Sequence, residues 1–373
     1  MTLSKLKLNL CSKGDPTDPQ TWSGTPFNIY SELMQMDRCG DAFNADISLV
    51  LKQFLAVVSV PLYGKVDIGR APIRRYANAF HVAMKTKASA SMHTLHMGTL
   101  SMPFLLRPSG QYHYLFCDST WHLWSRYATN MKRYSKRMIS LFDRLEKRAY
   151  SQMDHIFSVS HYVKENLIDH YGVPPRKITV VGTGLGEINP FSGEKNYSNR
   201  KILFVAKGRF LDKGGELVIA AFRRALESDP KLNLTIVGSE EAKRFDNSPN
   251  INVLGFIPLR DLQNLFDTHS LFLMPALNEP WGLVFLEAMA CKMPIMGLKR
   301  NSFPELSGYG KYGFSIEHAD PELLANAIVD AFRNPEQLKK IGEQAQAYCL
   351  DQFSWKKTVD RILEVIEGNR NNA

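Results

Sequence analysis

The chain has 373 residues, which exceeds a typical single domain and suggests about two domains. Hydrophobic residues make up 44% and charged residues 22%, so there is apolar material for two cores of a globular protein. The formal net charge of +9 suits an anionic partner, but no nucleic-acid-binding module is recognisable. No uninterrupted apolar run reaches the ~18 residues of a membrane span.

The cysteines and the N-terminal residues predict a cytoplasmic protein. The five cysteines are odd in number, widely scattered and without the spacing of a zinc site, which predicts reduced thiols: Cys11, Cys39, Cys117, Cys291 and Cys349. The first apolar run is interrupted by charges, so no secretory signal is expected.

The first half of the sequence predicts a parallel sheet with crossover helices. A strand-like run from Leu6 to Cys11 is followed by a polar loop containing Gly24 and then by a helical pattern through Leu33. Further apolar runs are expected to be strands separated by helices: Ile47 to Val60, Tyr112 to Phe116, His155 to Val159 and Lys177 to Val181.

The second half predicts another doubly wound sheet. Five short segments read as buried strands: KILFVAKG, LNLTIVGS, INVLGF, SLFLMPA and MPIMGL. Helical patterns follow the apolar residues at Gly215–Leu226, Arg260–Asp267, Leu283–Cys291, Pro321–Phe332, Pro335–Gln352 and Ser354–Gly368. Residues 186–200, rich in Gly, Ser, Asn and Pro, are expected to link a domain of residues 1–185 to one of residues 201–352.

The stretch VAKGRFLDKGG combines a strand end, a turn at Gly208 and two cations four residues apart. Arg209 and Lys213 beside a helix that opens at Gly214 would suit a diphosphate, although a plain basic surface loop is the alternative. The pattern is not a standard phosphate loop, because no GxxxxGK[ST] is present.

The stretch NEPWGLVFLEAMACKMPI carries Glu279 and Glu287 in an otherwise apolar segment. The preceding strand ends near Ala276, which places Glu279 in a loop at the carboxyl end of a strand, where open α/β sheets bind ligands. The amides near Leu283 and Val284 would be free donors at a helix start. Alternatively, Glu279 favours the helix dipole and Glu287 is a solvated surface residue.

Together the two stretches resemble the nucleotide-sugar half of the retaining family-4 (group 1) glycosyltransferases with the GT-B fold. The resemblance extends to LGFIPLRDLQNLFDTHSLFLMPA, NSFPELSGYGKYGF and FSVSHYVKENLIDHYGVPPRKITVVGTG, and DPQTWSGTPFNIYSEL looks like the N-terminal glycine loop of that family. It implies two Rossmann-like domains facing an interdomain cleft, with the donor on the C-terminal domain and the acceptor on the N-terminal one. Residues 353–373 would form a helix that crosses back to the N-terminal domain.

The resemblance also implies a role for each site residue. Arg209 and Lys213 would hold the donor diphosphate and stabilise it as a leaving group, Glu279 would bind hydroxyls of the transferred sugar, and Glu287 would bind the ribose. The remaining donor contacts would come from the backbone of Gly24, Gly208, Gly238, Phe256, Ile257, Trp281, Gly282, Leu283 and Val284. Transfer would retain the anomeric configuration through an oxocarbenium-like front-face route, which depends on electrostatic stabilisation.

One position departs from the family. In YLFCDSTW, Asp118 occupies the place where members often carry a histidine that touches the transferred sugar. An aspartate can accept the same hydrogen bond, so Asp118 is assigned to the substrate; alternatively, Asp118 and Ser119 cap the next helix.

No metal or other cofactor is expected. No two aspartates are separated by a single residue, as a metal-binding Asp-x-Asp motif requires, and His93 and His96 lack a third ligand. Arg209, Lys213 and helix starts would replace the metal.

The basic residues concentrate in residues 126–150. This helical stretch could rest on an anionic membrane and reach a lipid-linked acceptor, or it could be a solvated amphipathic helix. The expected activity is transfer of a hexosyl unit from a UDP- or GDP-sugar to a glycan or lipid-linked acceptor, in surface polysaccharide or lipopolysaccharide synthesis. The alternatives are a sugar-nucleotide 2-epimerase and an inactive donor-binding subunit. The enzyme would be cytoplasmic or peripheral on the inner face of the cell membrane.

Overall fold

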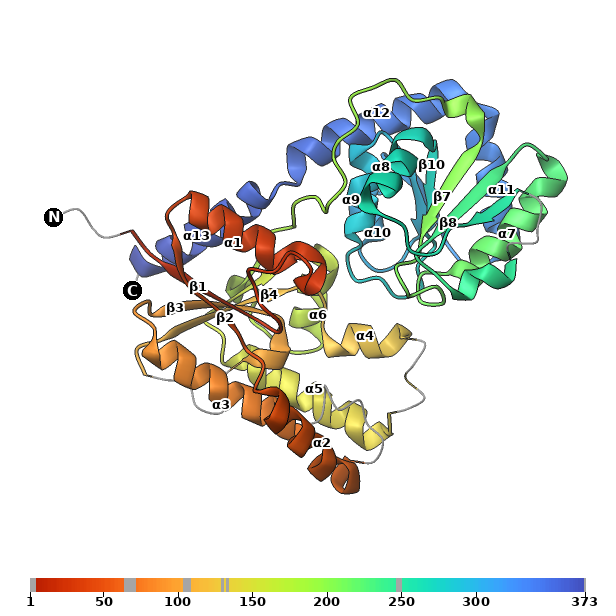
Figure 1. The fold of residues 1–373 in the computed structure, drawn as a ribbon. Coiled ribbons are helices and arrows are strands. Elements are labelled where there is room, and N and C mark those ends of the chain that lie inside the picture. The colour runs from red at the N-terminus through yellow and green to blue at the C-terminus, as the bar shows by residue number, and fades with distance from the viewer. Residues whose placement is uncertain are drawn as a thin grey trace. The chain divides into compact units, whose positions relative to one another are not determined.

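The computed structural model describes residues 5–63, 72–102, 109–128, 131, 134–245 and 250–371. The chain forms two compact units (Figure 1). Unit 1 comprises residues 1–126, 130–184 and 355–373, and unit 2 comprises residues 127–129 and 185–354. Each unit contains one parallel sheet with its own covering helices, so the predicted α/β class is confirmed.

Unit 1 is built on six parallel strands in the order β2-β1-β3-β4-β5-β6. The strands are β1 (Leu8–Ser12), β2 (Cys39–Asn44), β3 (His93–Met97), β4 (Tyr112–Cys117), β5 (His155–Ser158) and β6 (Ile178–Val180). The central strands β1, β4 and β5 are almost wholly buried, as expected for a parallel sheet with helices on both faces. The carboxyl ends of all six strands point to one edge of the sheet, where the loops after β1 and β4 begin.

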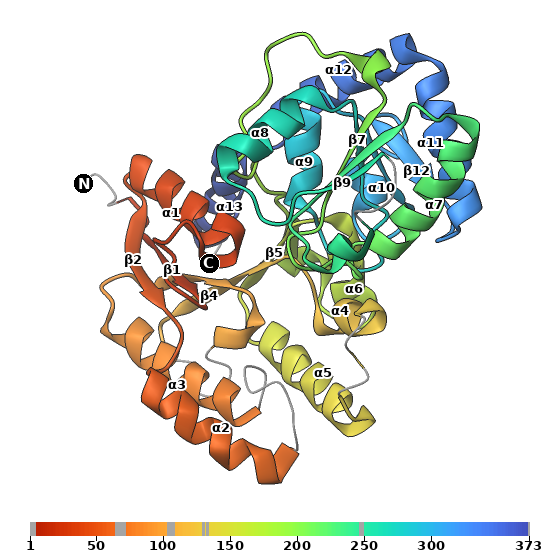
Figure 2. The same cartoon turned by 45° about the vertical axis from the view of Figure 1, so that its right-hand side comes forward.

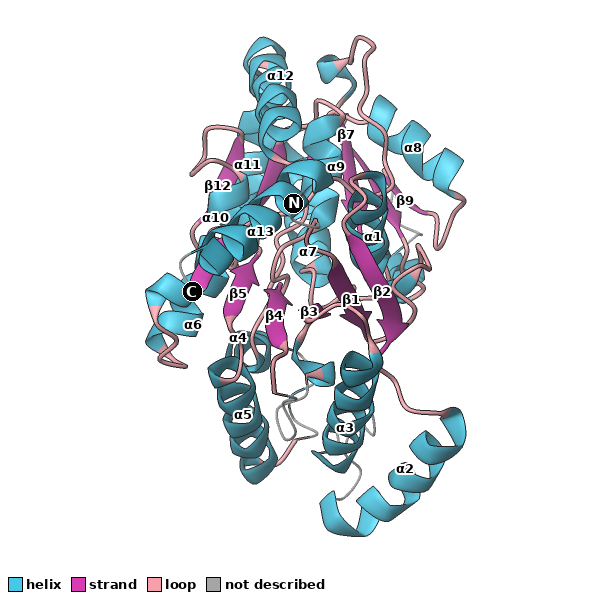
Figure 3. Ribbon diagram, turned by 90° about the vertical axis from the view of Figure 1, so that its left-hand side faces the viewer, coloured by secondary structure: helices cyan, strands magenta, loops and turns pink. Residues whose placement is uncertain are grey.

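Two layers of helices cover this sheet. The helices of unit 1 are α1 (Thr25–Gln35), α2 (Leu49–Tyr63), α3 (Pro72–Ala88), α4 (Trp121–Tyr127), α5 (Lys136–Ser151), α6 (His161–Asp169) and α13 (Trp355–Asn371). Helices α1 and α13 pack together on one side of the sheet, and α3 and α5 lie on the other (Figures 1 and 3).

The final helix, α13, belongs to unit 1 although its sequence follows unit 2. The guanidinium of Arg361 donates to the carbonyl oxygen of Val181 at 3.1 Å, and Arg38 forms an ion pair with Glu367. The chain therefore leaves unit 1 at Gly184 and returns to it at Trp355.

Unit 2 also has six parallel strands, in the order β12-β11-β10-β7-β8-β9. The strands are β7 (Lys201–Val205), β8 (Asn233–Val237), β9 (Ile251–Val253), β10 (Leu271–Leu273), β11 (Ile295–Leu298) and β12 (Gly313–Ile316). The helices are α7 (Gly215–Ser228), α8 (Leu259–Thr268), α9 (Leu283–Ala290), α10 (Phe303–Leu306), α11 (Pro321–Arg333) and α12 (Pro335–Gln352). Figure 2 shows α7 and α11 side by side and α9 beside the central strands.

The prediction for Ile47 to Val60 is wrong, because this apolar run forms most of helix α2 and not a strand. A run of this length exceeds the ~4–8 residues of a typical buried strand, so its length favoured a helix. Strands β2, β3 and β12 were not predicted. Strand β2 has no fully buried residue and reads CGDAFN, which lacks an apolar pattern.

The basic stretch of residues 126–150 does not form one continuous helix. Helix α4 ends at Tyr127, and α5 begins after Ser135, whose hydroxyl accepts a hydrogen bond from the amide of Met138. Helix α5 buries Met138, Phe142 and Leu145 in the core of unit 1. Its basic residues are exposed on the opposite face: Lys136, Arg137, Arg144, Lys147 and Arg148.

None of the helices in the described part of the chain is both long enough and apolar enough to cross a bilayer.

Candidate active site

The loop after β7 turns sharply through residues with left-handed backbone conformations. Lys207 has a φ of +45° and Gly208 a φ of +74°. Gly214, with a φ of +80°, precedes the first residue of α7. A Cβ atom on Gly214 would lie 2.2 Å from the carbonyl oxygen of Pro275, so only glycine fits between this loop and the segment after β10. The turn brings Arg209 and Lys213 back over the end of the sheet.

The two predicted cations converge on the predicted carboxylate. A guanidinium nitrogen of Arg209 lies 3.4 Å from a carboxylate oxygen of Glu279, and the ammonium of Lys213 lies 3.8 Å from the same oxygen. Lys213 also donates to the carbonyl oxygen of Val205 at 3.4 Å. Residues separated by about 70 positions therefore form one charged cluster, as the sequence predicted.

Backbone hydrogen bonds fix the loop that carries Glu279. The amides of Leu277 and Asn278 both donate to the carbonyl oxygen of Asp212, at 2.8 and 3.0 Å. In return, the guanidinium of Arg209 donates to the carbonyl oxygen of Asn278 at 2.7 Å. The loop after β7 and the loop after β10 thus hold each other in place, which preorganises the charges.

Helix α9 begins at Leu283, immediately beyond this loop. Gly282 precedes it with a φ of +87°, and no side chain caps the helix start. The amides of Leu283 and Val284 lie in the first turn, where no carbonyl of the helix can accept their hydrogen bonds. A Cβ atom on Gly282 would lie 3.2 Å from the Glu279 side chain, so this glycine keeps the helix start close to the carboxylate. Trp281 is buried and packs edge-on against Phe353.

Burial shapes the charge of Lys213. Its side chain is only 8% exposed, and burial lowers its pKa from 10.5. The Glu279 carboxylate opposes this shift, and the positive charge of Arg209 adds to it. The cluster therefore holds a poorly solvated cation that an anionic ligand would stabilise.

Glu287 makes a contact that the sequence did not reveal. Its carboxylate accepts a hydrogen bond from the amide of Glu187, at 2.9 Å, in the segment that follows the junction between the units. A Cβ atom on Gly186 would lie 2.0 Å from the same carboxylate oxygen, so the presence of glycine at this position was the available signal. Burial raises the pKa of Glu287, while the amides of Glu187 and Ile188 oppose the rise.

Gly208, Gly238 and Phe256 lie together beside this cluster. The amide of Gly208 donates to the carbonyl of Gly238, and the amide of Gly238 donates to the carbonyl of Gly255. The ring of Phe256, which is 68% exposed, lies 3.9 Å from where a Cβ atom on either Gly208 or Gly238 would be. Ile257 follows it, half-buried. Gly208 thus leaves open space beside an exposed aromatic ring, whereas a Cβ atom on Gly238 would lie 2.9 Å from the backbone nitrogen of Lys207, so that glycine allows close backbone packing.

Two predicted residues lie in unit 1, at the carboxyl edge of its sheet. Gly24 ends the loop after β1 and precedes α1 with a φ of +80°. Asp118 directly follows β4 and is half-buried. The first amides of α4 donate to other groups: Trp121 to the Glu146 carboxylate at 2.8 Å, and Leu123 to the hydroxyl of Thr120 at 3.2 Å.

Across the described ranges, no group of three or more His, Cys, Asp or Glu side chains is arranged to hold a metal ion. His96 and His113 form a buried pair with ring nitrogens 2.9 Å apart. Burial and the neighbouring His113 lower the pKa of His96 well below its usual value.

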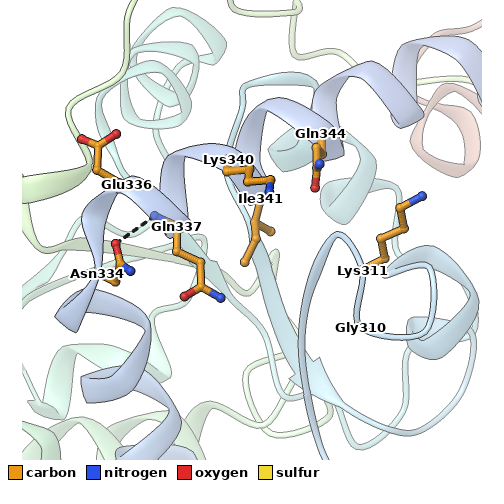
Figure 4. Close-up of a pocket in the computed structure, with 8 residues that line it drawn as sticks. All are labelled: Gly310, Lys311, Asn334, Glu336, Gln337, Lys340, Ile341 and Gln344. Carbon is orange, nitrogen blue, oxygen red and sulfur yellow. Dashed lines mark hydrogen bonds between the residues drawn. The ribbon is translucent and has the colours of Figure 1, made fainter.

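A larger hollow of unit 2 lies elsewhere (Figure 4). It has a volume of about 570 Å³ and is lined by Gly310, Lys311, Asn334, Glu336, Gln337, Lys340, Ile341 and Gln344. None of the predicted site residues lines it. The hollow beside Glu279, which Arg300 and Asn301 also line, measures about 10 Å³ and has room for about one water. We place the site at the charged cluster, because strand-end loops, paired charges and a helix start coincide there.

Comparison with known proteins identifies relatives over more than half of the chain. The chain is 25% identical over 241 residues to D-inositol 3-phosphate glycosyltransferase of Segniliparus rotundus, which covers 58% of this chain and 53% of the relative. The chain thus spans about half the length of the curated relatives it matches.

Solved structures share the fold. Sucrose-phosphate synthase of Thermosynechococcus elongatus matches with a TM-score of 0.74 and 15% identity, covering 99% of this chain and 100% of the other. Anabaena Alr3699/HepE in complex with UDP and glucose matches with a TM-score of 0.66 and 16% identity, covering 97% and 100%.

Two family models match consecutive parts of the chain. Residues 79–185 match the model described as Glycosyltransferase Family 4, and residues 187–348 match the model described as Glycosyl transferases group 1. Together they extend over most of the sequence, and they include the second sheet and strands β3 to β6 of the first. The chain belongs to the group 1 glycosyltransferases of family 4, with the GT-B fold.

Proposed function

We propose that the protein transfers a hexosyl unit from a nucleoside-diphosphate sugar to a glycan or lipid-linked acceptor, with retention of configuration and without a metal ion. The observation that carries this proposal is the cluster in which Arg209 and Lys213 lie within 4 Å of Glu279 beside the start of α9. Two cations and free helix-start amides suit a diphosphate, and an adjacent carboxylate suits sugar hydroxyls.

The leaving group is the nucleoside diphosphate, which gains negative charge as the glycosidic bond breaks. The guanidinium of Arg209 can bind two of its oxygens at once, while Lys213 supplies a compact charge from a buried position. Both are held before the donor arrives, so little reorganisation accompanies the reaction. A diphosphate would share these cations with Glu279, whose carboxylate would then accept hydrogen bonds from the transferred sugar.

The nucleoside would extend from the diphosphate toward Glu287 and Phe256. The Glu287 carboxylate accepts the amide of Glu187 and also interacts with the amide of Ile188. A carboxylate has about four acceptor sites, so a ribose hydroxyl could bind at one of the remaining ones. The exposed ring of Phe256 and the open space beside Gly208 suit a planar base. The solved relative bound to UDP and glucose supports a uridine nucleotide, with GDP as the alternative.

Two substitutions test the assignment. Arg209→Ala and Glu279→Ala should each lower transfer by about 10²–10³-fold, because each removes a charge positioned for the transition state. Arg224→Ala and Glu322→Ala are matched controls, since these residues form an exposed ion pair 3.0 Å long on α7 and α11 of the same unit. Near-normal transfer by both site variants would refute the assignment.

Incubation with the donor alone separates the alternatives. A transferase should release free sugar slowly from the donor, and donor consumption should become faster when an acceptor is added. A 2-epimerase would convert the donor to its epimer with no acceptor, and an inactive donor-binding subunit would give neither product. Thermal shift across a panel of nucleotide sugars would identify the base and sugar, because a bound donor raises the unfolding temperature.

A further inference from the structure

The outward face of helix α2 is apolar. Val50, Phe54 and Val57 lie on one side of the helix at spacings of four and three residues, and they are 77%, 62% and 73% exposed. Leu49 and Leu51 are exposed beside them. A solvated helix normally presents polar residues outward, so this face is the reverse of the usual pattern.

The inward face of α2 is anchored, which fixes the direction of the apolar face. Leu55 is buried, and Lys52 pairs with Asp46 at 2.9 Å. Asp46 also pairs with Arg74 of α3 at 3.2 Å. Helix α2 therefore lies against α3 at the periphery of unit 1 (Figures 1, 2 and 3). Its side chains Val50, Phe54 and Val57 are exposed to solvent.

Helix α3 continues the apolar surface. Tyr76, Phe80 and Met84 follow one another at intervals of four residues, and all three are exposed, Phe80 to 55%. The opposite face of α3 packs on unit 1 through Ala79, Val82 and Ala83. Two neighbouring helices thus expose apolar stripes while each is held by its other face.

The exposed charged residues of α3 are basic. Residues 47–63 and 72–92 contain no Asp or Glu. Of their five basic residues, Lys85 and Lys87 are exposed, Arg75 is buried, and Lys52 and Arg74 pair with Asp46. Helix α5, on the same side of the sheet, adds its exposed basic face, although its own apolar residues are buried in the core.

We infer that α2 and α3 form the membrane-binding surface of this protein, with Val50, Phe54, Val57 and Phe80 entering the interface of an anionic bilayer. Apolar side chains on a helix lying in the interface, flanked by Lys and Arg, are the chemistry that anionic lipid surfaces select. The basic helix α5 contributes long-range attraction and does not insert, because its apolar side faces the core.

Charge favours a bilayer over a second copy of the chain. A symmetric dimer through α2 and α3 would bring two patches of like charge together, which opposes association. An anionic bilayer satisfies the apolar stripes and the basic residues at once.

Vesicle binding tests this inference with the full chain and no nucleotide sugar, so its outcome is independent of the proposed transferase activity. Wild-type protein should co-sediment with vesicles of phosphatidylcholine and phosphatidylglycerol, mixed roughly two to one, and bind phosphatidylcholine alone much more weakly. Val50→Ser, Phe54→Ser and Val57→Ser combined should weaken binding about tenfold or more.

The matched control combines Met34→Ser, Leu323→Ser and Leu350→Ser, which are exposed apolar residues on other helices, at 53%, 45% and 45%. The control should bind as wild type. As an independent readout, the emission of a Phe54→Trp variant should shift to shorter wavelength on anionic vesicles, more than wild-type emission does.

Three results would overturn the inference. These are unchanged vesicle binding by the α2 variant, equal binding to vesicles with and without phosphatidylglycerol, and a wild-type dimer in solution that the α2 substitutions convert to monomer. If the protein binds anionic vesicles, this supports a lipid-linked acceptor only if the proposed transferase function is also correct. Failure to glycosylate such an acceptor would then count against the acceptor alone.

Discussion

The two units share one architecture but organise their charges in opposite ways. In unit 2, cations and carboxylates from separate loops meet at the carboxyl ends of β7 and β10, and the Lys213 and Glu279 side chains are largely buried. In unit 1, Lys85 and Lys87 of α3 and the basic residues of α5 are exposed, and α2 and α3 contain no Asp or Glu. Paired, preorganised charges suit chemistry on a small anion, whereas exposed basic residues suit attachment to an extended anionic surface.

Among the following substitutions, removing the buried cation of unit 2 should have the largest effect on transfer activity. Lys213→Met keeps the apolar stem and the length of the side chain but removes the charge that would stabilise the leaving diphosphate. We expect single-turnover transfer to fall by about 10²–10³-fold. Lys243→Met, at an exposed lysine of the same unit, should leave the rate unchanged. A loss of less than about threefold at Lys213 would show that unit 2 does not use its buried charge for catalysis.

Substituting one glycine in each unit distinguishes the cost of backbone strain from the cost of a steric clash. Gly214→Ala should destabilise unit 2 by about 2–4 kcal/mol, because the residue has a φ of +80° and its Cβ would lie 2.2 Å from the Pro275 carbonyl oxygen. Gly172→Ala in unit 1 has a similar φ of +70° and no atom within 4 Å, so it should cost only about 1–2 kcal/mol. Thermal unfolding measures both, and equal costs would contradict the steric account.

The role of Glu287 can be resolved with nucleotide analogues. Glutamine keeps an oxygen that can accept the Glu187 amide, so Glu287→Gln should stay folded. We expect it to weaken binding of the preferred nucleoside diphosphate about tenfold, through loss of a charged hydrogen bond to ribose. The wild-type protein should lose a similar factor in affinity when the ribose hydroxyls are removed from the nucleotide. The affinity of the variant should change little on the same removal. Both affinities can be measured by calorimetry. If the losses from the substitution and from removing the hydroxyls are additive, Glu287 does not bind the ribose and acts only by holding the Glu187 amide.

The smallest expected effect is a shift in pH dependence. The charged form of Lys213 would bind the donor, and burial lowers its pKa from 10.5 in the free protein. Values of kcat/KM, which report the free enzyme, should therefore fall as pH rises through a range below 10.5. Lys213→Arg should move this fall to higher pH, since guanidinium stays charged. An unchanged alkaline limb would assign it to another group.

Much of unit 2 was predictable from sequence. Arg209, Lys213 and Glu279 follow strands that turned out to neighbour one another, and the carboxyl ends of parallel strands share an edge. The glycines at positions 208, 214 and 282 marked turns that the structure confirms by their positive φ values. Local sequence was sufficient here because each loop is short and rigid.

Unit 1 was less predictable, for physical reasons. The run from Ile47 to Val60 was taken for a strand because buried strands and apolar helices share composition, and its exposure on α2 contradicts the usual rule for apolar residues. The bond between Glu287 and Glu187 joins residues 100 positions apart and depends on how the linker lies, which spacing does not encode.

The return of α13 to unit 1 makes unit 2 an insertion within another domain. Apart from residues 127–129, unit 2 is one continuous segment, and the points where the chain departs and comes back are in contact: a Cβ on Gly184 would lie 2.3 Å from the Trp355 ring. A few residues joining Gly184 to Trp355 should therefore yield unit 1 as an independent protein, whereas simple truncation after residue 184 would strip a covering helix from its sheet.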